Sequence, residues 1–223
     1  MKGKDIEIIP TIVPTALSNI RDVSGQYASF TSFFQIDVTD GKFAPNITWL
    51  PVEDFTLPKE YGYEVHLMVA DPTRVGTAFA KAGARRLMAH VEALGDVEKT
   101  RAIFETWKKN GVEEIGIALL LQTPLETLRA YLPFADYVLL MTIARIGVQG
   151  IPYDPNAPAR VAALRKQHPD ITIAVDGGVS EGTIEELARA GATRFGVGSA
   201  IAKAPDPKAA YEHLQRLAQK AVG

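Results

Sequence analysis

The chain has 223 residues, of which 47% are hydrophobic, and this is enough to enclose one large core in a single domain over residues 1–223. Its 24 basic and 26 acidic residues give a formal charge of -2, which argues against nucleic acid or an anionic membrane as a partner. The absence of cysteine excludes disulfides, thiolate metal sites and cysteine nucleophiles, so any metal must use His, Asp, Glu or amide oxygen.

The N-terminal residues, Met1 to Asp5, lead directly into a short strand-like run. They contain no apolar stretch long enough for a signal peptide or a membrane span. We therefore expect a soluble, cytoplasmic protein.

Runs of β-branched and aliphatic residues recur along the chain at spacings of roughly 25 to 30 residues, with amphipathic stretches between them. This alternation predicts parallel strands joined by helical crossovers. Eight such strands suit a closed (β/α)8 barrel, also called a TIM barrel. The runs are Ile6 to Val13, Phe33 to Val38, Tyr63 to Met68, Arg86 to Val91, Ile115 to Leu121, Tyr137 to Met141, Ile171 to Val175, and Arg194 to Val197.

Glycines mark the ends of several predicted helices, since Gly83, Gly111 and Gly191 each stand where a helix must stop before a strand. The stretch from Pro152 to Pro158 predicts a long loop after the sixth strand. An open doubly wound sheet is the alternative topology. It is disfavoured because no glycine-rich dinucleotide turn follows the first strand.

Two carboxylates are predicted at the carboxyl ends of strands, where barrels of this type form their active sites. Asp37 shares a strand face with Gln35, and Asp176 ends the seventh strand, which a closed barrel can bring across the mouth from the second. The plainer interpretation of Asp37 is a loop cap that accepts backbone N–H bonds. As a pair, the carboxylates suit an epimerisation in which one removes a proton from carbon and the other delivers one to the opposite face.

Such a reaction passes through an enediolate, whose negative oxygen a divalent metal ion would stabilise as a Lewis acid. His66, at the end of the third strand, is a candidate ligand, with a hydrogen-bonded core histidine as the alternative. Thr11 ends the first strand and faces the same mouth. His90 and Glu92 alternate at the end of the fourth strand, where they either line the mouth or have a structural role.

Phosphate binding is indicated by two glycine groups, Gly177 and Gly178 after the seventh strand and Gly198 with Ser199 after the eighth. Barrels of this kind commonly hold phosphate there, because glycine lets backbone N–H groups approach the oxygens. For either group alone, the alternative is that the glycines are needed only for a tight turn from strand to helix.

The segment 37–48 reads Asp-Val-Thr-Asp-Gly-Lys-Phe-Ala-Pro-Asn-Ile-Thr and resembles the Asp-Val-Met-Asp-Gly-His-Phe-Val-Pro-Asn segment of ribulose-phosphate 3-epimerases. The resemblance continues in family order over nearly the whole chain. It runs through Val65-His66-Leu67-Met68, His90-Val91-Glu92-Ala93, Leu140-Met141-Thr142, Val175-Asp176-Gly177-Gly178-Val179 and Gly198-Ser199-Ala200-Ile201.

The resemblance implies an isomerase of the pentose phosphate pathway that interconverts D-ribulose 5-phosphate and D-xylulose 5-phosphate, with Asp37 and Asp176 as the acid/base pair. It also implies a homo-oligomer and a metal site, for Mn, Mg, Zn or Fe, made of Asp37, His66, Asp176 and the residue at position 35. That residue is Gln35 where the family has a histidine. A neutral amide oxygen should weaken zinc binding and favour Mg²⁺ or Mn²⁺, or leave the site without metal.

A second departure lies at residues 143–150, where the family has a loop that closes on the substrate. The sequence reads Ile-Ala-Arg-Ile-Gly-Val-Gln-Gly there, and we expect Gly147 to contact substrate. Arg145 either touches a phosphate or carboxylate or is exposed to solvent.

Three functions follow. The first is 3-epimerisation of ribulose 5-phosphate or a close relative such as a ketohexose 6-phosphate. Decarboxylation or aldol chemistry on a related barrel would need an Asp-x-Lys-x-x-Asp array, but Thr39 stands where the lysine would be. The third is a divergent phosphosugar-binding barrel with impaired catalysis or an altered substrate, suggested by Gln35 and the changed loop.

Overall fold

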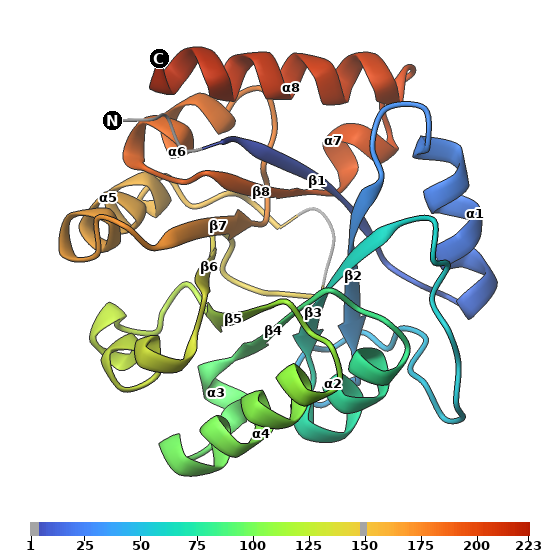
Figure 1. Ribbon diagram of the computed structural model, residues 1–223. Helices are drawn as coiled ribbons and strands as arrows, with labels where there is room; N and C mark the ends of the chain where they lie inside the picture. Colours follow the sequence, from blue (N-terminus) through green and yellow to red (C-terminus); the bar gives the residue numbers. More distant parts are fainter. Residues whose placement is uncertain (1–4, 148–150) are drawn as a thin grey trace.

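Eight parallel strands close into a barrel in the computed structural model, which describes residues 5–147 and 151–223 (Figure 1). Each strand pairs with its neighbours in chain order, and β1 closes the barrel by pairing with β8. The strands are β1 (Glu7–Ile12), β2 (Phe33–Thr39), β3 (Gly62–Met68), β4 (Arg86–His90), β5 (Glu114–Leu119), β6 (Tyr137–Met141), β7 (Thr172–Asp176) and β8 (Arg194–Val197). The predicted TIM barrel is confirmed.

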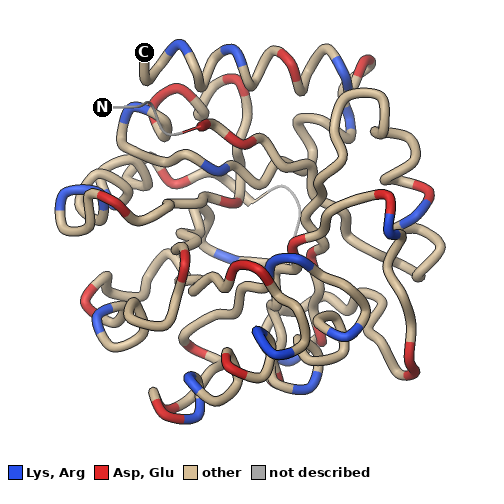
Figure 2. Tube along the Cα trace, viewed as in Figure 1, with Lys and Arg blue, Asp and Glu red and all other residues tan. Residues whose placement is uncertain are grey.

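Helices surround the barrel, and charges of both signs are interspersed over them and the loops (Figures 1 and 2). Asp71, Asp96 and Asp206 each cap a helix by accepting a backbone N–H bond from the residue three positions later. No helix in the described residues has the length and apolar character needed to cross a membrane. The helices are α1 (Leu17–Tyr27), α2 (Pro72–Lys81), α3 (Val91–Leu94), α4 (Val97–Lys109), α5 (Ala157–Gln167), α6 (Ile184–Ala190), α7 (Ser199–Ala202) and α8 (Pro207–Val222), with short 3-10 helices η1 (Leu125–Ala130) and η2 (Leu132–Phe134).

Two of the predicted helical crossovers are wrong in detail. The connection from β2 to β3, residues 40–61, contains no helix, and the connection from β5 to β6 contains only η1 and η2. The first of these segments contains Pro45, Pro51 and Pro58, and proline removes a backbone donor and interrupts helix interiors. The β2–β3 connection therefore crosses as an extended loop that reaches the mouth of the barrel.

The side chains of β2 alternate between the layer under the helices and the lumen of the barrel. Phe34, Ile36 and Val38 are fully buried in the layer between the strands and the helices. Gln35 and Asp37 occupy the alternate positions, which face the lumen. The strand is thus apolar on its outer face and carries its polar chemistry on the inner one.

An ion cluster fills the lumen at the amino ends of the strands. Arg86 lies 2.8 Å from Glu7 and 2.9 Å from Glu114, and Arg194 lies 2.8 Å from Glu7 and 3.0 Å from Glu114. Glu64, 1% exposed, lies 3.5 Å from Arg86, and burial raises its pKa to about 7. These charges support the barrel at the end opposite the strand carboxyl ends.

Helix α2 packs closely on α4 because residue 76 is glycine. A Cβ atom at Gly76 would lie 2.4 Å from Cζ2 of Trp107 and 2.9 Å from Cδ1 of Leu67. We expect Gly76→Ala to lower the free energy of unfolding by about 1–3 kcal/mol, because the buried indole must move. Gly25→Ala in α1 is the matched control, since nothing lies within 4 Å of its Cβ position and alanine should stabilise that helix by up to about 1 kcal/mol. Urea unfolding compares the two, and equal midpoints would contradict the packing argument.

Candidate active site

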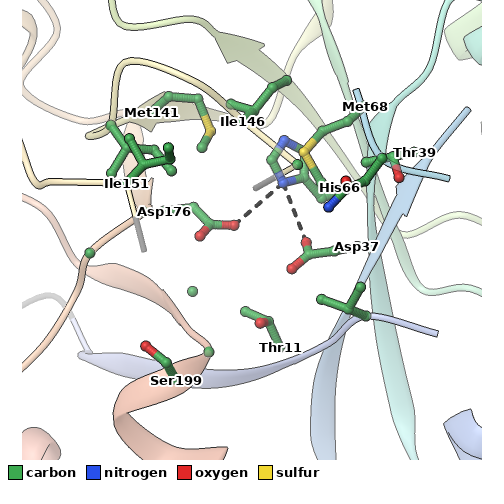
Figure 3. A pocket seen from close by; sticks show the side chains of 18 of the residues that line it. Thr11, Asp37, Thr39, His66, Met68, Met141, Ile146, Ile151, Asp176 and Ser199 are labelled. Carbon is green, nitrogen blue, oxygen red and sulfur yellow. Dashed lines mark ion pairs between the residues drawn. The ribbon is translucent and has the colours of Figure 1, made fainter. Parts of the chain in front are cut away.

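A cavity of about 410 Å³ opens at the carboxyl ends of the strands (Figure 3). The predicted site residues are brought together there, except Gln35, which is not among the lining residues. The predicted residues that line the cavity are Thr11, Asp37, His66, Gly147, Asp176, Gly177, Gly178, Gly198 and Ser199.

The two carboxylates, Asp37 and Asp176, converge across this cavity from β2 and β7 (Figure 3). The buried amide of Gln35 lies between them, where Nε2 donates to Asp37 Oδ1 at 2.7 Å and to Asp176 Oδ2 at 2.5 Å. Burial, with the charge of Asp176 added, raises the pKa of Asp37. A carboxyl pair in one site favours a state in which one member keeps a proton. The alternative interpretation of Asp37 was a loop cap. Asp40 caps the loop instead, because it accepts N–H bonds from Lys42, Phe43 and Ala70.

His66 is fully buried and points its Nδ1 atom between the carboxylates, 3.4 Å from Asp37 Oδ1 and 3.4 Å from Asp176 Oδ2. Burial alone would lower the pKa of His66, but the interactions with Asp176 and Asp37 outweigh it and raise the pKa to about 9. At 3.4 Å these are ionic contacts rather than well-formed hydrogen bonds. The Nδ1 atom has no hydrogen-bond partner among the described residues.

Asp37, His66 and Asp176 form a group that could hold a metal ion, with ligand atoms all within 4.8 Å of one another. Two atoms that bind one ion at about 2.0–2.2 Å lie about 3.0–3.5 Å apart. The 3.4 Å spacings from His66 Nδ1 to both carboxylate oxygens match this value. The unpartnered Nδ1 atom and the two carboxylates therefore fit a divalent cation.

Gln35 does not fit the predicted role of a fourth ligand. Its 2.5 and 2.7 Å contacts with the carboxylates are too short for two ligands of one ion and suit N–H···O hydrogen bonds. Ionised carboxylates only accept hydrogen bonds, so the amide nitrogen, which cannot bind a cation, faces them. The amide oxygen on which the prediction rested points elsewhere.

His90 and Glu92 do not line the cavity but stand behind His66. His66 Nε2 lies 2.9 Å from His90 Nε2, and His90 Nδ1 lies 3.5 Å from Glu92 Oε2. Burial lowers the pKa of His90 to about 4, so the ring is neutral. The structural interpretation of these two residues is therefore favoured. Alternation on β4 predicted that His90 faces inward, but the sequence contained no signal for its contact with His66.

Glu92 anchors this chain of contacts. It accepts hydrogen bonds from Leu120 N at 3.0 Å and from the Thr123 hydroxyl, and burial opposes its charge. The hydrogen bonds outweigh burial and lower its pKa to about 2.

We expect Glu92→Gln to destabilise the fold by about 1–2 kcal/mol at pH 7, because the hydrogen bonds that lower the pKa of Glu92 to about 2 favour the folded state, while solvent around this partly exposed carboxylate screens part of the effect. A lowered carboxyl pKa gives stability that is present above pH 4.5 and is lost as the pH falls toward 2. The cost should therefore be smaller at pH 3 than at pH 7. Urea unfolding at both pH values measures it, and a cost independent of pH would contradict this account.

Glycines shape the side of the cavity that is formed by the loops after β7 and β8. Gly177 and Gly178 have φ values of 106° and 68°, a left-handed conformation that side chains rarely adopt. A Cβ atom at Gly198 would lie 3.0 Å from Thr11 Oγ1, and Ser199 begins α7 directly after it. These loops keep backbone close to the cavity.

The segment after β6 contributes apolar side chains that the sequence did not single out. Ile143 and Ile146 line the cavity with Gly147, whose φ is 71°. Arg145 is exposed and is not among the lining residues, so its solvent-exposed interpretation is favoured. Residues 148–150 of this predicted loop lie outside the described residues. Other lining residues missed from the sequence are Val13, Thr48, Ile151 and Val179.

The sequence matches a profile described as the Ribulose-phosphate 3 epimerase family over residues 7–202. It is 30% identical to ribulose-phosphate 3-epimerase of Schizosaccharomyces pombe over 96% of this chain and 95% of that protein. It is 34% identical to ribulose-phosphate 3-epimerase of Bacillus subtilis over 94% of this chain and 98% of that protein.

The barrel is also similar to a solved structure of 3-hexulose-6-phosphate synthase from Salmonella typhimurium. The TM-score is 0.67 at 15% identity, with 97% of this chain and 100% of the other covered. At that identity the likeness concerns the fold alone.

Proposed function

Because the chain belongs to the ribulose-phosphate 3-epimerase family, we propose that it inverts C3 of D-ribulose 5-phosphate to give D-xylulose 5-phosphate, or acts likewise on a closely related phosphoketose. Family membership makes it an epimerase, an isomerase that acts on carbohydrates. The observation that carries the proposal is the convergence of Asp37 and Asp176 across one cavity, bridged by Gln35.

Asp37 and Asp176 exchange the protons. The ionised member of the pair removes the C3 proton, and the electrons of the C–H bond move into the C2–C3 bond while the carbonyl π electrons move onto O2. The protonated member then delivers a proton to the opposite face of C3, and the C2 carbonyl re-forms. The raised pKa of Asp37 supports a pair that enters the reaction with one proton. The two carboxyl groups end in exchanged protonation states.

Negative charge develops on O2 during this exchange, and positive charge nearby lowers its free energy. His66 lies between the carboxylates, where it orients both of them. Asp37, His66 and Asp176 would hold a divalent cation, Mn, Mg, Zn or Fe, which supplies Lewis-acid stabilisation of the enediolate when bound.

The phosphate is held on the opposite wall by the backbone of Gly177, Gly178, Gly198 and Ser199, with Thr11 beside them. Left-handed glycines and the start of α7 allow N–H groups to approach phosphate oxygens. Ile143, Ile146 and Gly147 cover the sugar and exclude water from the reacting carbon.

Incubation with D-ribulose 5-phosphate in D₂O, followed by NMR, tests the proposal. We expect deuterium at C3 of both ribulose 5-phosphate and xylulose 5-phosphate. A parallel panel of ketohexose 6-phosphates identifies the preferred substrate. Phosphosugar binding with neither deuteration nor product would contradict epimerisation, and it would favour the second candidate, a binding barrel in which the exposed Arg145 and the apolar Ile146 have changed the loop's role.

A further inference from the structure

We propose that Gln35 is a positioning residue whose amide N–H groups hold Asp37 and Asp176 facing each other, and that it is not a ligand of the metal site. The inference deepens the proposed function, because these carboxylates are its acid/base pair. It concerns the ground-state arrangement of the site and can be tested without substrate.

The contacts of Gln35 specify its orientation. The side chain is 1% exposed, and its single nitrogen reaches both carboxylates, Asp37 Oδ1 at 2.7 Å and Asp176 Oδ2 at 2.5 Å. An amide nitrogen has two hydrogens, one for each carboxylate. With the oxygen in that place, it would face the ionised member of the pair as acceptor against acceptor at hydrogen-bond distance, which is repulsive whichever carboxyl holds the proton.

The amide oxygen lies against β8, where residue 196 is glycine. A Cβ atom at Gly196 would lie 2.9 Å from Gln35 Oε1 and 3.1 Å from Asp176 Cγ. The missing side chain at this position makes room for both groups. β8 therefore accommodates the oxygen while β2 and β7 present the carboxylates to the nitrogen.

The hydrogen bonds from Gln35 offset the electrostatic repulsion between the carboxylates of Asp37 and Asp176. Two carboxylates that share a buried site repel each other and turn apart unless positive groups lie between them. Hydrogen bonds from the neutral amide to ionised oxygens are among the strong ones and need no bound ion. Gln35 thereby keeps Asp37 and Asp176 directed at one point when no cation is bound, whereas a bound cation would itself hold the two carboxylates together.

The same geometry makes the amide a competitor of a cation. Asp37 Oδ1 and Asp176 Oδ2, which accept from Gln35, are also the atoms 3.4 Å from His66 Nδ1. A cation held by His66 must share these two oxygens with the amide hydrogens. Loss of the amide should therefore tighten cation binding, whereas loss of a fourth ligand would weaken it.

The experiment titrates Mn²⁺ into the full-length protein without substrate and follows free Mn²⁺ by electron paramagnetic resonance. For Gln35→Met, which keeps the length of the side chain but has no donor, we expect about tenfold tighter Mn²⁺ binding. In chelator, we expect its Tm to fall by about 5 °C as the carboxylate pair loses its bridge. Equal or weaker Mn²⁺ binding would overturn the proposal.

Gln35→Asn is the second variant and is used in the same titration if the methionine variant does not fold. Its shorter amide cannot span the two carboxylates, so it should also bind Mn²⁺ more tightly than the unsubstituted chain, and equal or weaker binding again overturns the proposal. Gln122→Met is the matched control, because Gln122 donates to Ala144 O outside the carboxylate cluster and should leave Mn²⁺ affinity unchanged.

These experiments can reject the proposed epimerase function and the proposed role of Gln35 independently of each other. Tighter Mn²⁺ binding by the Gln35 variants, in a chain that does not epimerise any phosphoketose tested, supports the inference and rejects the proposed function. Weaker binding in a chain that does epimerise rejects the inference alone.

Discussion

Replacement of either Asp37 or Asp176 by asparagine is expected to lower kcat/KM for epimerisation by about 10³-fold, because each variant loses one of the two proton-transfer groups. Asparagine keeps the size of the side chain and cannot take up a proton. The binding of substrate, which we assign to the glycine-lined wall, should change far less. A coupled assay of xylulose 5-phosphate formation measures the loss.

The two variants should also differ in a direction-specific way. With one carboxylate remaining, one variant should still exchange the C3 hydrogen of ribulose 5-phosphate with D₂O, and the other that of xylulose 5-phosphate. Asp206→Asn is the matched control, because Asp206 caps α8 through Ala209 N and asparagine caps helices equally well. Full turnover by either site variant would rule out the two-carboxylate mechanism.

Arg194→Met is expected to lower the free energy of unfolding by about 2–3 kcal/mol, because it removes one of the two arginines that pair with the half-buried carboxylates of Glu7 and Glu114 and leaves only Arg86 there. Arg194 is 5% exposed, lies 2.8 Å from Glu7 and 3.0 Å from Glu114, and covers the ring of Tyr137 with 4.7 Å between the guanidinium carbon and the ring centroid. Burial alone would raise the pKa of Glu7, but Arg86 and Arg194 outweigh it and lower that pKa.

The loss of stability caused by Arg194→Met should depend on pH in a defined direction. A lowered pKa gives stability that is present above the unfolded value of 4.5 and is lost as the pH falls through the folded pKa, so the cost of Arg194→Met should be smaller at pH 3 than at pH 7. Arg189→Met is the control, because its pair with Glu185 is exposed and should contribute within about 0.5 kcal/mol. Similar losses in the two variants by urea unfolding would show that the cluster in the lumen has no special weight.

The strands could be predicted closely, whereas some connections could not. A parallel strand is buried on both faces and appears as a nearly continuous apolar run, and the run Tyr137 to Met141 matches β6 without error. The β2–β3 connection was expected to be helical because helices usually cover parallel sheets. Its prolines, Pro45, Pro51 and Pro58, were the signal that could have corrected this expectation.

The site residues were predicted because their positions follow from local rules. Asp37 alternates with Ile36 and Val38, and Asp176 ends an apolar run, so each carboxylate was expected at the mouth. The direction of the Gln35 amide was not accessible, because it depends on Asp176 from β7 and on the space above Gly196 in β8. The contact of His66 with His90 likewise joins neighbouring strands.

By itself, the sequence determined the order of the strands, the faces of their side chains and the family to which the chain belongs, because these depend on alternation and on short motifs. Which atoms come into contact depends on closure of the barrel in the tertiary structure. Closure brings residues 35, 66 and 176 together from β2, β3 and β7, and the spacings of 2.5–2.7 Å for Gln35 and 3.4 Å for His66 distinguish a hydrogen-bond donor from a side chain that could bind a metal ion. Such distances arise from packing around the whole barrel, which no local pattern along the chain encodes.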